Sequence, residues 1–247
     1  MKYKFLKFSV FIALITIIFN ACKKDDDQTP DNPLNGKTTA VFNNSVNYGT
    51  MTDQDGNVYR TVTIGTQTWM AENLRTTKYN DGTNIPNVTD SIEWSNLTTG
   101  AYCNYLNTID LEKIATYGRL YNWYAVNTEK LAPIGWHVPN DDEWLTLVTY
   151  LGGENVAGGK LKETGTMHWY SPNNGASNET GFTSISGGVR TSIYEVFVGL
   201  SYYGCWWSAT ELDSRRAFGR EMDHYTSHLD YSLYYKDNGV SVRCLRD

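Results

Sequence analysis

Basic residues are scarce in this chain of 247 residues, which has 21 Lys and Arg against 27 Asp and Glu. The formal net charge is −6, and residues 1–21 hold three of the lysines and no acid, so the rest of the chain carries −9. Binding to nucleic acid requires clustered Lys and Arg that neutralise phosphates and release counterions. We therefore expect no nucleic-acid partner.

The sequence also lacks the motifs that commonly identify a catalytic centre. It contains no Gly-x-Ser-x-Gly elbow, no phosphate-binding loop and no His-Glu-x-x-His pair. His224 and His228 could share a metal only if a turn brought them together, because residues four apart on a strand lie about 13 Å apart. His137 and His168, each beside a tryptophan, are interpreted as hydrogen-bonded structural residues. We expect no cofactor, no metal site and no assignable catalytic residue.

Long apolar runs are absent except in residues 8–19, which follow three lysines. This run is too short to span a bilayer as a stable helix and is typical of a secretory signal. It ends at Cys22, which is preceded by Ala21 and followed by the charged residues 23–27. This pattern resembles a lipobox, in which the cysteine is acylated after cleavage. Several acyl chains anchor a protein firmly to a membrane.

The chain is therefore expected to comprise a lipoprotein signal peptide (residues 1–21), a lipidated tether (22–50) and one domain (51–247). The tether is rich in Asn, Thr, Pro and Gly and has no sustained period. The Lys-Asp-Asp run after Cys22 resembles a surface-export signal of Bacteroidetes lipoproteins. It favours an exported protein held in the outer membrane, at the cell surface, by the acylated Cys22. The alternatives are a signal cut elsewhere, an uncleaved anchor, or a run that is only a solvated spacer.

The remaining pattern predicts an α+β domain. Residues 57–64 alternate as a strand after the turn at 53–57, and a calcium loop there is disfavoured because Ile64 stands where the twelfth ligand would be. Asn140 with Glu143 forms a capping box that begins a helix ending near Gly152. Residues 120–126 have helical spacing. Short strands are expected at 204–210, 217–222, 228–235 and 239–245.

Cysteine is also rare, with four residues in the chain. Once Cys22 is acylated, Cys103, Cys205 and Cys244 remain in an oxidising compartment. Three pairings are possible. We favour a Cys205–Cys244 disulfide because both residues lie on predicted C-terminal strands.

Aromatic residues, in contrast, are plentiful, with eight Trp and eighteen Tyr. Such a surplus is typical either of a packed core or of platforms for sugar rings. Residues 168–179 combine two aromatics with many amides. We expect Trp169 and Tyr170 to stack on a ligand while Asn173 and Asn174 bond its hydroxyls, with plain packing of the two rings as the alternative. Residues 202, 203, 206 and 207 are expected to be at least half core.

Several phrases occur in a fixed order along the domain: residues 64–74 (IGTQTWMAENL), 117–123 (YGRLYNW), 135–139 (GWHVP), 181–182 (GF), 207–211 (WSATE) and 241–244 (SVRC). Their order resembles the Fibrobacter succinogenes major paralogous domain family over residues 51–247. The resemblance implies no particular activity.

A more distant likeness concerns the fold. The phrases at 135–139, 187–190 and 239–244 are similar in order to landmarks of formylglycine-generating and sulfatase-modifying proteins. This likeness implies a C-type-lectin-like fold with a twisted antiparallel sheet, one or two helices and long loops. The oxidase activity is not expected, because residues 188–196 contain no cysteine. The calcium-binding tripeptides of C-type lectins are absent as well.

These features favour a surface-anchored, non-catalytic binding or adhesion domain, with a glycan or a cell-envelope protein as its partner. Two alternatives stay open: an envelope hydrolase acting on polysaccharide, and a structural surface protein. Fold alone decides none of these.

Overall fold

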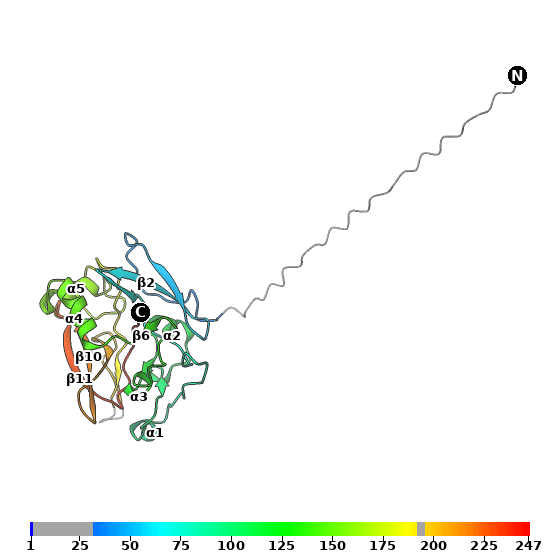
Figure 1. The fold of residues 1–247 in the computed structure, drawn as a ribbon. Helices are drawn as coiled ribbons and strands as arrows, with labels where there is room; N and C mark the ends of the chain where they lie inside the picture. Colours follow the sequence, from blue (N-terminus) through cyan, green and yellow to red (C-terminus); the bar gives the residue numbers. More distant parts are fainter. Residues whose placement is uncertain (2–31, 192–195) are drawn as a thin grey trace. The chain divides into compact units, whose positions relative to one another are not determined.

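The computed structural model describes residues 32–191 and 196–247, together with Met1. The chain divides into residues 1–30 and a compact unit, residues 31–247. All helices and strands named below belong to the compact unit (Figure 1). Cys22 lies outside the described residues.

Residues 32–48 fall within the expected tether, yet they belong to the compact unit. Leu34 is buried, and Phe42, Val46 and Tyr48 pack against the apolar cluster around Trp69. The Asn32 amide donates to the carbonyl of Asp55, over 2.9 Å. Because the segment is fixed by such side-chain contacts rather than by a regular element, its sequence shows no period. The tether prediction is therefore wrong for these residues.

The first sheet has five antiparallel strands and joins the two ends of the compact unit. Its order is β1 (Gly49–Thr52), β2 (Val58–Ile64), β3 (Gln67–Met70), β12 (Leu245–Arg246) and β6 (Trp136–His137). The predicted strand at 57–64 is confirmed as β2. A two-residue turn connects β2 to β3, and Gly65 has a φ of 61° there, which a glycine adopts without strain.

The second sheet has three antiparallel strands in the order β11 (Asp230–Tyr235), β10 (Arg216–Asp223) and β9 (Tyr203–Glu211). Three of the predicted C-terminal strands are thus confirmed, with small shifts of their ends. The fourth, at 239–245, is mostly isolated bridges, because its backbone pairs in turn with Arg190, Tyr121 and Trp206. Two further pairs are β4 (Tyr102–Cys103) with β5 (Leu120–Tyr121) and β7 (Val189–Arg190) with β8 (Phe197–Val198).

The described residues form five α-helices, more than the one or two expected: α1 (Ser91–Ser95), α2 (Leu111–Tyr117), α3 (Trp123–Val126), α4 (Asp141–Tyr150) and α5 (Glu154–Leu161), with a 3-10 turn at Tyr105–Asn107. Helix α4 begins with the predicted capping box of Asn140 and Glu143. It packs against β9 and β10. The expected helix at 120–126 is a short strand followed by α3. The α+β class is confirmed.

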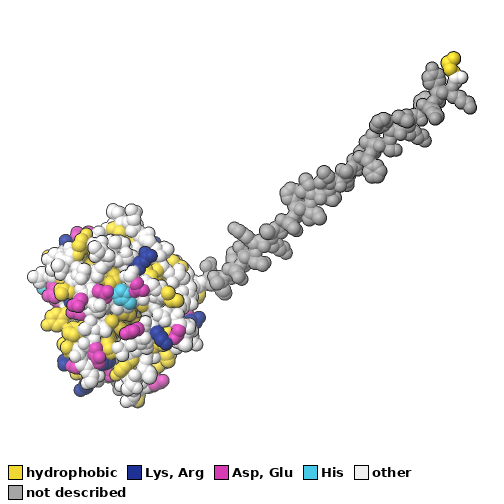
Figure 2. Space-filling view, in the orientation of Figure 1, with side chains coloured by type: hydrophobic (Ala, Val, Ile, Leu, Met, Phe, Trp, Pro, Cys, Tyr) yellow, Lys and Arg dark blue, Asp and Glu magenta, His cyan; other side chains and the backbone are white. Residues whose placement is uncertain are grey.

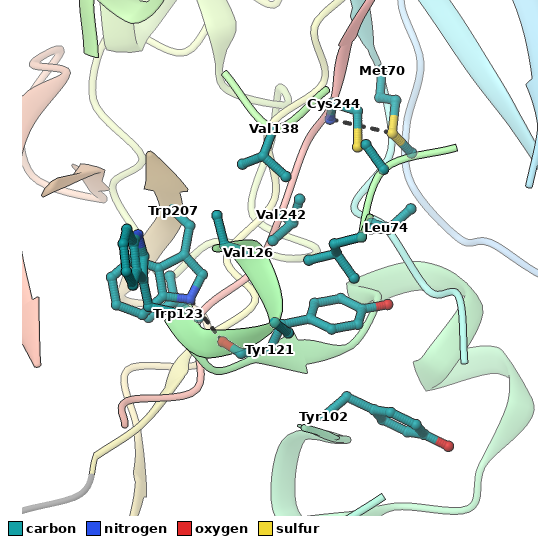
Figure 3. Packing of buried hydrophobic residues seen from close by; sticks show 14 of the residues in the cluster. Met70, Leu74, Tyr102, Tyr121, Trp123, Val126, Val138, Trp207, Val242 and Cys244 are labelled. Carbon is teal, nitrogen blue, oxygen red and sulfur yellow. Dashed lines mark hydrogen bonds between the residues drawn. The ribbon is translucent and has the colours of Figure 1, made fainter. Parts of the chain in front are cut away.

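Seven of the eight tryptophans are buried, so the aromatic surplus is mainly core. One cluster surrounds Trp123 and Trp207, and the Trp207 indole donates to the carbonyl of Tyr121 over 2.7 Å (Figure 3). A second cluster contains Trp69, Trp144 and Trp169 beneath α4. Trp206 and Trp207 are both buried although they point to opposite faces of β9, because each face is covered by a different apolar cluster, whereas Tyr202 and Tyr203 are exposed.

The three described cysteines are all free and buried, so the predicted Cys205–Cys244 disulfide is wrong. Trp206 pairs in parallel with Ser241, which places Cys205 beside Val240. Cys244 is then about four residues further along, roughly 13 Å away for extended chain. A disulfide needs Cα atoms about 4.4–6.8 Å apart.

Arg243 is fully buried, and the hydrogen bonds of its side chain run to an amide oxygen and to backbone carbonyls. Its Nε donates to Oδ1 of Asn73 over 2.9 Å, and its other nitrogens donate to the carbonyls of Phe182 and Thr183. Its guanidinium also lies 4.3 Å from the centre of the Phe182 ring. Burial lowers the pKa of Arg243 to about 9, which leaves it charged at neutral pH.

We expect Arg243→Met to destabilise the protein by about 3 kcal/mol or more, because it leaves several buried acceptors without a donor. Urea unfolding would measure the loss. The matched control is Arg246→Met, at an exposed position three residues later, where we expect a change within about 0.5 kcal/mol. Equal stability of the two variants would contradict a central role for Arg243.

Candidate functional site

Two of the four predicted ligand-binding residues are not available at the surface. Trp169 is 1% exposed, and its indole donates to the carbonyl of Ser184 over 2.9 Å. Asn173 is buried, and its amide donates to the carbonyls of Glu163 and Gly165. The prediction that Trp169 and Asn173 contact a ligand is therefore wrong. Both side chains are buried and form hydrogen bonds within the protein.

Tyr170 is at the surface and forms the centre of an aromatic group. Its ring stacks on that of Tyr202, with centroids 4.9 Å apart and planes 14° apart. The edge of His224 meets both rings, at 5.6 Å and 5.3 Å, and Tyr225 lies 3.8 Å from His224. We call these four residues the tyrosine cluster. Tyr170, Tyr202 and Tyr225 are 54%, 42% and 64% exposed, whereas His224 is buried.

Three loops meet in the tyrosine cluster. The Tyr170 amide donates to the carbonyl of Ser201 over 2.7 Å, which fixes the first loop against the second. The fourth predicted residue, Asn174, is exposed, and its side chain donates to the carbonyl of Tyr225 over 2.7 Å. The sequence pointed to Tyr170 and Asn174 and brought Tyr202 into consideration. It offered His224 only as a metal ligand and gave no signal for Tyr225, because both lie about fifty residues away along the chain.

Lys162 holds these loops from below. It directly follows helix α5 and is fully buried. Its ammonium donates to the carbonyls of Asn174, Asp223 and Thr226 over 2.8, 3.0 and 2.7 Å. Burial lowers the pKa of Lys162 to about 8 although the carboxylate of Asp223 opposes the change, so the ammonium keeps its three donors at neutral pH.

The two histidines considered for a metal site do not converge. Nδ1 of His224 contacts the carbonyl of Ser171 at 3.1 Å, and Nδ1 of His228 lies 3.9 Å from Asp230. Within residues 32–191 and 196–247, no three His, Cys, Asp or Glu side chains are placed to hold a metal ion.

A separate cavity of about 440 Å³ opens beside the end of the first sheet. Its walls include the half-buried Trp136 and the exposed Ile134, and His137 and Asp247 stand at its edge. His137 joins two carboxylates: Nδ1 lies 2.6 Å from Asp247, and Nε2 lies 2.9 Å from Glu143. Figure 2 shows a histidine between acidic side chains on this side of the compact unit.

Both nitrogens of His137 can donate only when the ring is protonated. Burial alone would lower the pKa of His137, but the hydrogen bonds to Asp247 and Glu143 outweigh it and raise the pKa above its ordinary value of 6.5. When protonated, His137 connects Asp247, which follows β12, to Glu143 at the start of α4.

We expect Lys162→Met to loosen the tyrosine cluster, because three buried carbonyls lose their donor, at a cost of about 2–4 kcal/mol. Hydrogen exchange should accelerate at the amides of Asn174 and Tyr225. Lys160→Met is the control, since Lys160 forms only an exposed ion pair with Glu179, which is worth little. Unchanged exchange in Lys162→Met would show that the loops are held by other contacts.

We expect the stabilisation from His137 to be present in full below pH 6.5 and to be lost as the pH rises through the raised pKa of the folded state. The melting temperature of the wild type should exceed that of His137→Asn at pH 6, and the difference should shrink at pH 9. NMR titration of the imidazole would locate the pKa directly. A difference that does not depend on pH would contradict the charged bridge.

No described helix is long and apolar enough to cross a membrane.

Comparison with known proteins identifies the family of the chain. No curated protein and no solved structure matches it. The model of the Fibrobacter succinogenes major domain matches residues 62–246, from the second half of β2 to the last strand. This range includes the tyrosine cluster, Lys162 and His137, and the phrases that carried the resemblance. The chain therefore belongs to the Fibrobacter succinogenes major domain family.

Proposed function

We propose that the compact unit is a binding or adhesion domain that recognises glycans through the tyrosine cluster. The observation that carries this proposal is the exposure of three tyrosine rings on a support that is itself buried and hydrogen-bonded. Exposed aromatic rings are costly unless they serve recognition, and rings held in fixed positions lose little entropy on binding. The face of a sugar ring stacks well on such a surface.

Polar groups beside the rings fit the same ligand. Asn174 is exposed next to Tyr225, and Asp223 lies two residues before it. Amides and carboxylates at the rim would bond sugar hydroxyls and set the orientation of the ring. The recognition surface in this proposal performs no chemistry.

The setting of the domain is part of the proposal. Export, acylation of Cys22 and anchoring in the outer membrane at the cell surface are supported by residues 1–27 of the sequence. A C-type-lectin-like arrangement is supported by the two antiparallel sheets, the closure of the first sheet by β12 and the long loops. An anchored domain with a rigid aromatic face is suited to holding glycans at the surface.

The test is binding of the full chain, purified in mild detergent, to a panel of plant, host and bacterial glycans. Tyr170→Ala and Tyr225→Ala should each weaken binding about fivefold, because each removes stacking worth about 1 kcal/mol. Tyr231→Ala is the control, since Tyr231 is 60% exposed on β11 but stands outside the cluster.

Equal affinity of all three variants would remove the cluster from the recognition surface. If the wild type bound none of the glycans, glycan recognition would be contradicted. Pull-down from intact cells would then search for a cell-envelope protein as the partner.

A further inference from the structure

Thr39, His168 and Glu163 form a continuous line of hydrogen bonds away from the tyrosine cluster. The hydroxyl oxygen of Thr39 lies 3.0 Å from Nε2 of His168, and Nδ1 of His168 lies 2.7 Å from Oε2 of Glu163. A hydroxyl, an imidazole and a carboxylate in this order form the arrangement of an activated nucleophile: nucleophile, base, and the group that orients the base.

The contacts fix which atom carries each proton. The carboxylate of Glu163 is fully buried and accepts from the amide of Val41 as well as from the imidazole. With Glu163 ionised and His168 neutral, Nδ1 of His168 carries the ring proton and Nε2 presents its lone pair. In this arrangement, which the reaction requires, the Thr39 hydroxyl donates to His168.

A second hydroxyl completes the group. Oγ1 of Thr116 accepts from the Thr39 amide and lies 3.0 Å from Oγ1 of Thr39. Since the Thr39 proton points to His168, the proton of Thr116 points to the Thr39 oxygen. The Tyr117 ring and the His168 imidazole pack edge to face, with their centroids 5.7 Å apart, and this contact holds the imidazole in place.

Accessibility favours chemistry at Thr39. His168 and Glu163 are buried, whereas Thr39 is exposed on an extended segment. Thr38 and Ala40, which alternate with it, border a cavity on the other side of that segment. The reaction requires that a reactant reach the Thr39 hydroxyl from the exposed side of this segment while the base and its carboxylate remain dry.

We propose that Thr39 is a nucleophile for small carboxylic esters, with His168 as general base and Glu163 as the residue that positions it. As the Thr39 oxygen attacks the ester carbonyl, its proton moves to Nε2 of His168 and an oxygen–carbon bond forms. The ester bond then breaks, and the proton passes from His168 to the leaving alcohol. Water, activated by the same imidazole, releases the acyl group from Thr39 as a carboxylic acid.

The Thr116 hydroxyl donates to the Thr39 oxygen and orients it for attack. Stabilisation of the developing oxyanion is therefore weak, and the threonine methyl group crowds the attack, so turnover is slow and the acyl-threonine accumulates. Thr39 precedes residues 62–246, which match the family.

The experiment exposes the full chain in mild detergent to p-nitrophenyl acetate and locates the acetyl group by peptide mass mapping. Thr39 should carry it, and the initial rate should fall at least tenfold in Thr39→Val and His168→Gln, because general-base assistance is worth about 100-fold or more. Thr39→Ser should react at least as fast as the wild type. Thr38→Val is the matched control and should react like the wild type.

Acetylation of lysines alone, or a rate that is the same in Thr39→Val, would overturn the proposal and leave the three residues as a clamp on residues 38–41. Circular dichroism verifies that each variant is folded. If His168→Gln does not fold, Thr39→Val still tests the proposal, because Thr39 is exposed. The proposal does not depend on glycan recognition, because Thr39→Val leaves the tyrosine cluster unchanged.

Discussion

The contact between Arg243 and Asn73 is the interaction on which the rest of the compact unit depends. Oδ1 of Asn73 accepts from Arg243 and from the Trp206 indole, each over 2.9 Å, and its amide donates to the carbonyl of Tyr117. The phrases that identify the family contain or adjoin these residues. Their fixed order along the chain thus reflects one buried polar centre, and a guanidinium is tolerable there because Asn73 and the carbonyls of Phe182 and Thr183 accept from it.

Buried cations bond to backbone carbonyls at two other irregular parts of the chain. Arg190 donates to the carbonyls of residues 88, 89 and 90, as Lys162 does to three carbonyls beneath the tyrosine cluster. Long loops leave carbonyls without partners in a helix or sheet, and buried carbonyls must be paired. Three buried cations supply that pairing. The fold therefore keeps short strands and long loops without losing a defined shape.

The dependence of the loops on long-range hydrogen bonds also explains what could and could not be predicted from the sequence. Helix α4 and strand β2 follow from local signals, a capping box and alternation, and both are where they were expected. Residues 32–48 look like a tether because long-range bonds, such as Thr39 to His168, hold them and local periodicity does not. Trp169 resembles a surface residue because its neighbours are polar, yet those neighbours bond to backbone and leave the indole in the core.

The two proposed sites share one short stretch of chain. Lys162 supports the tyrosine cluster and the adjacent Glu163 positions His168, while His168 and Tyr170 flank the buried Trp169. His168 and Tyr170, which flank Trp169 in the sequence, thus belong to different proposed sites. A substitution at Trp169 would disturb both sites through packing, whereas Thr39 and Tyr225 each affect one. Because each site ends in an exposed side chain distant from this stretch, recognition and ester chemistry are separable by experiment.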